Sequence, residues 1–221
     1  MQHDFILLDR SGSMQSKWVE AMGAVNAYVA RLAADRVDTG VTLAVFDAED
    51  VHNETRMKFE IIRDRITPPT WREVSSVDAK PRGWTPLSDA IGKIVDLAER
   101  GNYDKVAIII MTDGEENASR ELSVDDAKRL LDKCRARNWQ VIFLGASFDN
   151  VRQSATLGGA TRQTVSANAG SYSVTTELLA SKRGIYGATG QAIDISDAEK
   201  HQLNQPAHIS TANPSTTGNN N

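Results

Sequence analysis

The sequence predicts an α/β fold: a doubly wound, mostly parallel sheet with one antiparallel edge strand, flanked by helices. Four short, almost wholly apolar runs are rich in β-branched residues, which is typical of strands buried on both faces of a sheet. Segments with helical periodicity lie between them, and an alternation of strands and helices favours parallel pairing. The four runs are residues 5–8, 41–46, 106–110 and 141–146.

Three other segments have weaker or different patterns. Residues 57–62 alternate between apolar and polar side chains. This alternation predicts an antiparallel strand at the sheet edge, after a turn near residues 47–53. Residues 163–166 predict a short final strand. The proline-containing stretch 67–82 predicts a long connection without regular structure.

Apolar residues recur at spacings of three and four in three segments, which predicts amphipathic helices. These helices cover residues 18–32, residues 87–98 with Gly101 after them, and residues 124–134 with Ser123 as the N-cap. A short helix is also expected over residues 149–157, ended by two glycines.

The length of 221 residues favours one domain, which we place at residues 1–203, followed by a polar tail over residues 204–221. The tail has no apolar pattern and is expected to be disordered.

Composition argues against several classes of protein. The net charge is −4 and no dense Lys/Arg stretch is present, so nucleic-acid binding is not expected. No apolar run approaches the roughly 20 residues that span a bilayer, and the first apolar run is too short for a secretion signal. Cys134 is the single cysteine, which is typical of the reducing cytoplasm, where we expect the protein to act.

Oxygen-bearing side chains gather where the predicted strands end. Asp9, Ser11 and Ser13 follow the first strand, Asp113 follows the strand at 106–110, and Thr85 lies in a loop before a helix. Ligands of open α/β sheets bind at the carboxyl ends of the strands. Five oxygen ligands on three loops would suit Mg²⁺ or Mn²⁺. Three of them are neutral hydroxyls, so the ion would keep an affinity for an external carboxylate.

These motifs together carry a family resemblance. Asp-x-Ser-x-Ser after the first strand, a Thr before a helix, and Thr-Asp-Gly after a later strand resemble the metal-ion-dependent adhesion site of von Willebrand factor type A domains, which have a Rossmann-like fold. The resemblance covers residues 3–166, and the segment beyond has no counterpart that we can place. The strings GWTPLSDAI, MTDGEENAS and IFLGAS resemble small intracellular bacterial and phage members most.

The resemblance implies a role for each residue of the motif. Ser11, Ser13 and Thr85 would bind the metal through their hydroxyls, whereas Asp9 and Asp113 would act mostly through bound waters. A partner protein would fill the open position with a Glu or Asp. Intracellular members often work with AAA-type ATPases, kinases or phosphatases, so the resemblance suggests a partner of this kind.

The roles of three residues near the motif can each be interpreted in two ways. Trp84 is either an anchor that faces the partner or a buried support for Thr85. Glu115 and Glu116 are either part of a solvated loop or acidic groups that exclude badly placed acidic partners.

The histidines and the cysteine predict no further site. His3, His52, His201 and His208 lack metal-ligand spacing, and Cys134 lies on the apolar side of a predicted helix. We expect all five to be structural or solvated.

Two functions remain from these patterns. The first is a metal-dependent binding module without enzymatic activity, which scaffolds or regulates a complex. The second is a Mg²⁺-dependent phosphohydrolase that uses Asp9 and Asp113. Ser11 stands where an aspartyl-phosphate enzyme would need a second acid, and neither a phosphate-binding glycine loop nor a nucleophile elbow is present. The binding module is therefore preferred, and turnover of phosphoesters would discriminate between the two.

Overall fold

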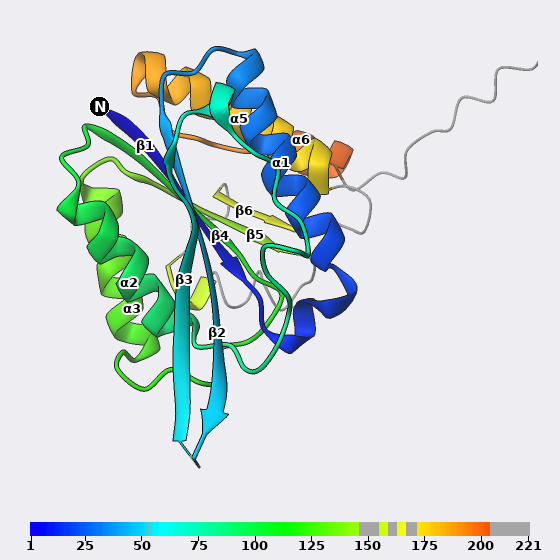
Figure 1. The fold of residues 1–221 in the computed structure, drawn as a ribbon. Helices are drawn as coiled ribbons and strands as arrows, with labels where there is room; N and C mark the ends of the chain where they lie inside the picture. The colour runs from blue at the N-terminus through cyan, green and yellow to red at the C-terminus, as the bar shows by residue number, and fades with distance from the viewer. Residues whose placement is uncertain (53, 146–154, 159–162, 167–171, 204–221) are drawn as a thin grey trace, which may run out of the picture.

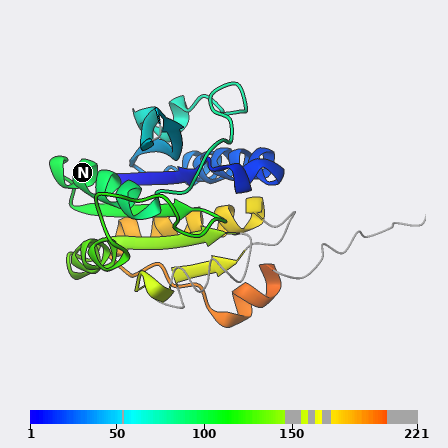
Figure 2. The same ribbon diagram turned by 90° about the horizontal axis from the view of Figure 1, so that it is seen from below.

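The computed structural model describes residues 1–52, 54–145, 155–158, 163–166 and 172–203. Within these residues, six strands form one sheet in the order β3-β2-β1-β4-β5-β6, in which only the β2–β3 pair is antiparallel. Figure 2 shows β1, β4, β5 and β6 side by side. The predicted fold class and the antiparallel edge strand are confirmed. The strands are β1 Gln2–Asp9, β2 Gly40–Val51, β3 Glu54–Ile66, β4 Lys105–Met111, β5 Gln140–Gly145 and β6 Thr164–Ser166.

Helices cover both faces of the sheet (Figure 1). One face carries α1 Trp18–Ala34, α5 Tyr172–Thr189 and α6 Asp197–Leu203, and the other carries α2 Leu87–Arg100 and α3 Val124–Ala136. The three helices expected from periodicity are confirmed, and Ser123 caps α3 through a reciprocal pair of bonds with Asp126. Most of the helix expected over residues 149–157, and all of the tail from residue 204, lie outside the described residues.

Alternate residues of each inner strand enter the two halves of the core. Ile6 and Leu8 pack with α1 and α5, whereas Phe5 and Leu7 pack with α2 and α3. All four side chains are almost fully buried. Each such burial stabilises the fold by about 1.5–3 kcal/mol, which explains why these runs contain hardly any polar residue. Among the described helices, none is both long enough and apolar enough to cross a membrane.

Helix α5 was not predicted from the sequence, and it is anchored by a fully buried ion pair. Arg183 Nε donates to Asp4 Oδ1 at 2.6 Å, and both side chains are 0% exposed. Tyr28 donates to the other oxygen of Asp4 at 2.9 Å, and Arg183 also donates to Gln2. Helices α1 and α5 are therefore joined to β1 by polar bonds as well as by apolar packing.

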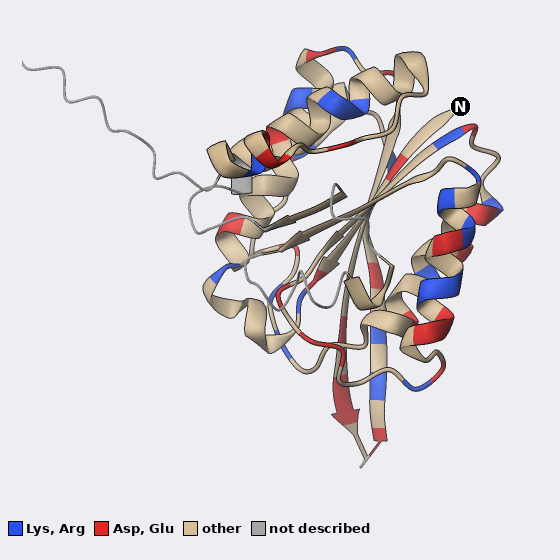
Figure 3. Ribbon diagram, turned by 180° about the vertical axis from the view of Figure 1, so that it is seen from behind, with Lys and Arg blue, Asp and Glu red and all other residues tan. Residues whose placement is uncertain are grey.

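The antiparallel pair β2–β3 extends beyond the other strands at the carboxyl edge of the sheet (Figure 1). Both strands are longer than the apolar patterns predicted. Strand β2 continues to Val51, so most of the range expected for the turn, residues 47–53, is strand. Acidic residues mark the end of β2, and basic residues mark the adjacent part of β3 (Figure 3). Lys58 bonds to Glu49 across this pair at 3.1 Å.

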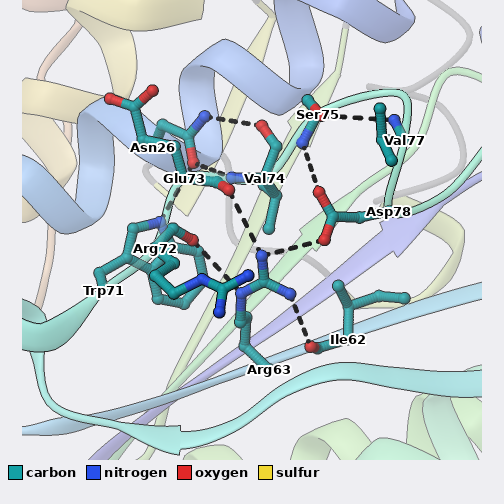
Figure 4. A network of polar contacts seen from close by, with 10 residues as sticks. All are labelled: Asn26, Ile62, Arg63, Trp71, Arg72, Glu73, Val74, Ser75, Val77 and Asp78. Atoms are coloured by element: carbon teal, nitrogen blue, oxygen red, sulfur yellow. Dashed lines mark hydrogen bonds and ion pairs between the residues drawn. The ribbon is translucent and has the colours of Figure 1, made fainter.

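The connection from β3 to α2 lacks regular structure, as predicted, apart from the short 3₁₀ helix Pro68–Thr70. Arg63 donates to the carbonyls of Arg72 and Glu73 and to the carboxylate of Asp78 (Figure 4). Asn26 of α1 bonds to both the N–H and the carbonyl of Val74. These side chains fix the path by which the chain reaches residues 82–85.

Candidate metal centre

The first loop of the site begins at the end of β1. Asp9 is fully buried, and its Oδ1 accepts the backbone N–H of Ser11 at 2.7 Å. Its Oδ2 accepts the hydroxyl of Thr112, just after β4, at 2.6 Å. Because β1 and β4 are neighbours in the sheet, Asp9 joins the two loops that leave their carboxyl ends.

The serines and the second carboxylate form a chain of hydrogen bonds. Residues Gly12–Ser16 form a 3₁₀ turn, which keeps the hydroxyls of Ser11 and Ser13 3.0 Å apart. Ser13 donates to Asp113 Oδ1 at 3.0 Å. The other oxygen of Asp113 accepts from the ammonium of Lys17 at 2.6 Å, a contact that the sequence patterns did not suggest.

Thr85 is placed by a close approach of its loop to β2. The N–H and the carbonyl of Trp84 both bond to Ala48, and Gly83 accepts from the N–H of Gly12 at 3.1 Å. Gly83 has a φ of 66°, and a Cβ at this position would lie 1.9 Å from the carbonyl oxygen of Ala48. Only glycine fits there. The side chain of Thr85 is therefore held at the loop of Ser13, and it is 2% exposed.

Oxygens from the loop after β1 and from the loop of Thr85 converge beside Gly114, which lies in the third loop. A Cβ atom added to Gly114 would lie 2.8 Å from Thr85 Oγ1, 3.1 Å from Ser13 Oγ and 3.4 Å from Asp9 Oδ2. Together with the Ser11 and Asp113 contacts, this brings all five predicted ligands to one place. Two hydroxyls and a carboxylate this close together are a donor set that suits a hard divalent cation.

Ion pairs to a buried carboxylate join two loops of the site. The buried carboxylate of Asp47 on β2 accepts from Arg10 at 2.7 Å and from Arg82 at 2.8 Å. Arg82 also donates its N–H to the carbonyl of Arg10 at 2.7 Å. Arg10 lies between the candidate ligands Asp9 and Ser11, and Arg82 precedes the loop of Thr85. Asp47 therefore holds these two loops together.

The loop after Asp113 is joined to the start of α2. The carboxylate of Asp89 accepts the backbone N–H groups of Arg120, Glu121 and Leu122 at 2.7–3.0 Å. Asn117 bonds to both the N–H and the carbonyl of Thr85. Asn117 therefore positions Thr85, a role that sequence patterns alone did not indicate.

Glu116 and Glu115 occupy different environments. Glu116 accepts the N–H of Ser88 at 2.6 Å, and its other oxygen accepts the N–H groups of Ala118 and Ser119. It supplies the cap that Pro86, at the N-cap of α2, lacks. These bonds turn the carboxylate of Glu116 inward, whereas Glu115 is exposed.

Replacing Glu116 with Ala is expected to lower the free energy of unfolding by about 2 kcal/mol, because charge-assisted bonds at a helix start are lost. Glu115→Ala is the matched control and should change it by less than about 0.5 kcal/mol. Urea unfolding of both variants measures this difference. Equal stability of the two variants would contradict the capping role.

Trp84 is 52% exposed, and its indole N–H points to Asp50 at 3.4 Å. The backbone of Trp84, rather than its ring, supports Thr85. The ring thus lies on the surface next to the site, where a partner can contact it.

Burial raises the pKa of Asp9 from its ordinary value of 3.8 to about 6, although hydrogen bonds from Thr112 and Ser11 lower it. A bound cation would favour the ionised form and offset this cost.

The histidines and Cys134 lie apart from these loops where they are described. His3 is buried in the sheet and bonds to Thr42, and burial lowers its pKa to about 4. Cys134 lies on the buried side of α3, and burial raises the pKa of its thiol to about 11. Within the described residues, no group of three or more His, Cys, Asp or Glu is suited to a metal. The candidate centre is instead rich in hydroxyl groups.

The fold and the position of the candidate centre define a class: an open α/β sheet with oxygen-bearing side chains on the loops at its carboxyl edge. The sequence model of the von Willebrand factor type A domain matches residues 5–180. The chain therefore belongs to this family, which commonly mediates metal-dependent protein interactions. The match continues past residue 166, where the motif resemblance ended, into α5. No protein of curated function matches the sequence.

Solved structures with the same fold have low sequence identity. The PilB minor pilin from Streptococcus sanguinis has a TM-score of 0.62 and 13% identity, over 83% of this chain and 61% of the pilin. The manganese-loaded TRAP protein of Plasmodium vivax has a TM-score of 0.53 and 16% identity, over 76% of this chain and 68% of that one. The domain of the pilus tip protein Mfa5 from Porphyromonas gingivalis has a TM-score of 0.59 and 11% identity, over 83% of this chain and 95% of that domain.

Proposed function

We propose that this chain is a metal-dependent protein-binding module. A Mg²⁺ or Mn²⁺ ion would be held by Ser11, Ser13 and Thr85, with Asp9 and Asp113 bound through waters or directly. The ion would take its last ligand from a Glu or Asp of the partner. The observation that carries this proposal is the convergence of Thr85, Ser13 and Asp9 oxygens beside Gly114.

The chemistry of the ligands supports a binding role. Asp9 and Asp113 offset the two charges of the ion, and the hydroxyls add no further negative charge. An ion held in this way attracts an anionic ligand. The exposed ring of Trp84 lies beside the loop of Thr85 and provides an apolar contact for the partner. A fold neighbour whose structure is manganese-loaded adds support from the same architecture.

We further propose that the module acts in the cytoplasm, within a complex that contains an AAA-type ATPase, a kinase or a phosphatase. This part rests on the resemblance of the motif strings and on the single cysteine, Cys134. Affinity capture with Mn²⁺ and with chelator, followed by mass spectrometry, would identify partners that require the metal.

Metal binding is tested by placing a methyl group among the oxygens beside Gly114. Gly114 lacks a positive φ, so alanine is compatible with its backbone. Its methyl group would nevertheless meet the buried hydroxyl of Thr85 at 2.8 Å. We expect the wild type to bind Mn²⁺ and to melt several degrees higher with Mn²⁺ than with EDTA. Gly114→Ala should lose both effects.

Gly23→Ala is the matched control, because nothing lies within 4 Å of the added methyl group in α1. It should bind Mn²⁺ like the wild type. Identical melting in Mn²⁺, Mg²⁺ and EDTA, with no heat of binding in calorimetry, would refute the proposed function. Turnover of p-nitrophenyl phosphate with Mg²⁺ would favour a phosphohydrolase instead.

A further inference from the structure

Lys17 lies in direct contact with the proposed metal centre. Its ammonium donates to Asp113 Oδ2 at 2.6 Å, while Ser13 donates to Oδ1 of the same carboxylate. The side chain of Asp113 is only 3% exposed and that of Lys17 is 31% exposed. Water therefore screens the carboxylate of Asp113 poorly, whereas the side chain of Lys17 reaches solvent.

The backbone of Lys17 is fixed. Its N–H donates to the carbonyl of Met14, and its own carbonyl accepts the N–H of Ala21 in the first turn of α1. The short turn that presents Ser13 thus also presents Lys17 four residues later. The ammonium is kept near Asp113 by the same element that supplies a proposed metal ligand.

We propose that Lys17 is a tethered competitor of the metal ion, which sets the affinity of the centre. This inference rests on the proposed function. Asp9 and Asp113 together carry two negative charges, and Lys17 already offsets one of them. A divalent ion bound at the same carboxylates must either displace the ammonium from Asp113 or remain beside a like charge, and both options weaken its binding.

The same contact couples the metal to the acidic partner. With the ion bound and Lys17 nearby, the centre has one positive charge in excess. A carboxylate from the partner removes this excess. Lys17 therefore makes the bound ion more dependent on the partner than it would be with Asp9 and Asp113 alone, and the coupling is reciprocal.

The test compares three lysine variants by calorimetric titration with Mn²⁺ alone. Lys17→Met keeps most of the length of the side chain without the charge. It should bind Mn²⁺ roughly tenfold more tightly than the wild type, because a partly exposed charge-assisted bond no longer competes. Lys17→Arg keeps the charge and should stay close to the wild type. Lys128→Met removes one charge on α3, where Lys128 pairs with Asp132, and should also leave the affinity unchanged.

Melting provides a second readout. In EDTA, Lys17→Met should melt lower than the wild type, because Asp113 has lost its counter-ion. The gain in melting temperature on adding Mn²⁺ should be larger for Lys17→Met than for the wild type. If Lys17→Met binds Mn²⁺ as tightly as the wild type or more weakly, the inference is overturned and the proposed function stands. If neither protein binds Mn²⁺, the proposed function itself fails.

Discussion

Replacing Arg183 with Met is expected to lower the free energy of unfolding by about 3–5 kcal/mol, because the change leaves the carboxylate of Asp4 buried without its counter-ion. Both side chains of this pair are 0% exposed, so water cannot take the place of the lost guanidinium. The bonds that remain to Asp4 come from the hydroxyls of Tyr28 and Thr39, which carry no charge. Urea unfolding at pH 7.5 would measure the loss.

Two controls separate the buried charge from a simple loss of packing. Adding Asp4→Asn to Arg183→Met removes the isolated charge, so the double variant should be more stable than the single one. Arg31→Met breaks a surface pair with Asp35 and should cost less than about 0.5 kcal/mol. If Arg183→Met cost no more than Arg31→Met, α5 would not depend on this ion pair.

The inner strands were predictable because each is covered on both faces. Phe5 and Leu7 face one pair of helices, and Ile6 and Leu8 face the other, so no position in this run tolerates a polar residue. Helix α5 was not predicted because it lacks such an apolar pattern. It is rich in Ser, Thr and Gly, and one of its most buried residues is charged. The partner of Arg183 lies 179 positions away in the sequence, where local periodicity cannot reveal it.

The five candidate ligands were found because each follows a strand or precedes a helix, and the sheet brings such positions together. The sequence did not reveal in which direction the other side chains of these loops point. The adjacent residues Glu115 and Glu116 look alike in the sequence, yet only Glu116 caps α2. In the sequence, nothing distinguishes Lys17 from other lysines near a helix start. Only the structure shows that its ammonium contacts Asp113.

The ionised Asp9 is expected to destabilise the fold in the absence of metal, and Asp9→Asn should therefore stabilise it at neutral pH. The folded pKa of about 6 lies above the ordinary value of 3.8, so the folded protein holds this proton more tightly than the unfolded chain. The contribution of Asp9 to stability is greatest at low pH. It falls as the pH rises from about 3.8 to about 6 and then stays constant.

At pH 7.5 this cost reaches about 3 kcal/mol, since each pKa unit corresponds to about 1.4 kcal/mol. Asparagine can keep both contacts, because its carbonyl accepts the N–H of Ser11 and its amide donates to the hydroxyl of Thr112. In EDTA, Asp9→Asn should thus unfold at a higher urea concentration than the wild type at pH 7.5, and the advantage should shrink at pH 4.5. His3 has the opposite pH dependence, but it is present in both proteins and cancels in the difference.

Adding Mn²⁺ should reverse the order of stability at pH 7.5. The ion stabilises the ionised carboxylate of the wild type, whereas Asp9→Asn has no charge to offer and should gain little. A buried carboxylate that lowers stability without the cation, and no longer does so once the cation binds, is typical of a binding site selected for function. An Asp9→Asn variant that is less stable than the wild type in EDTA at pH 7.5 would contradict this account of Asp9, whatever its affinity for the metal.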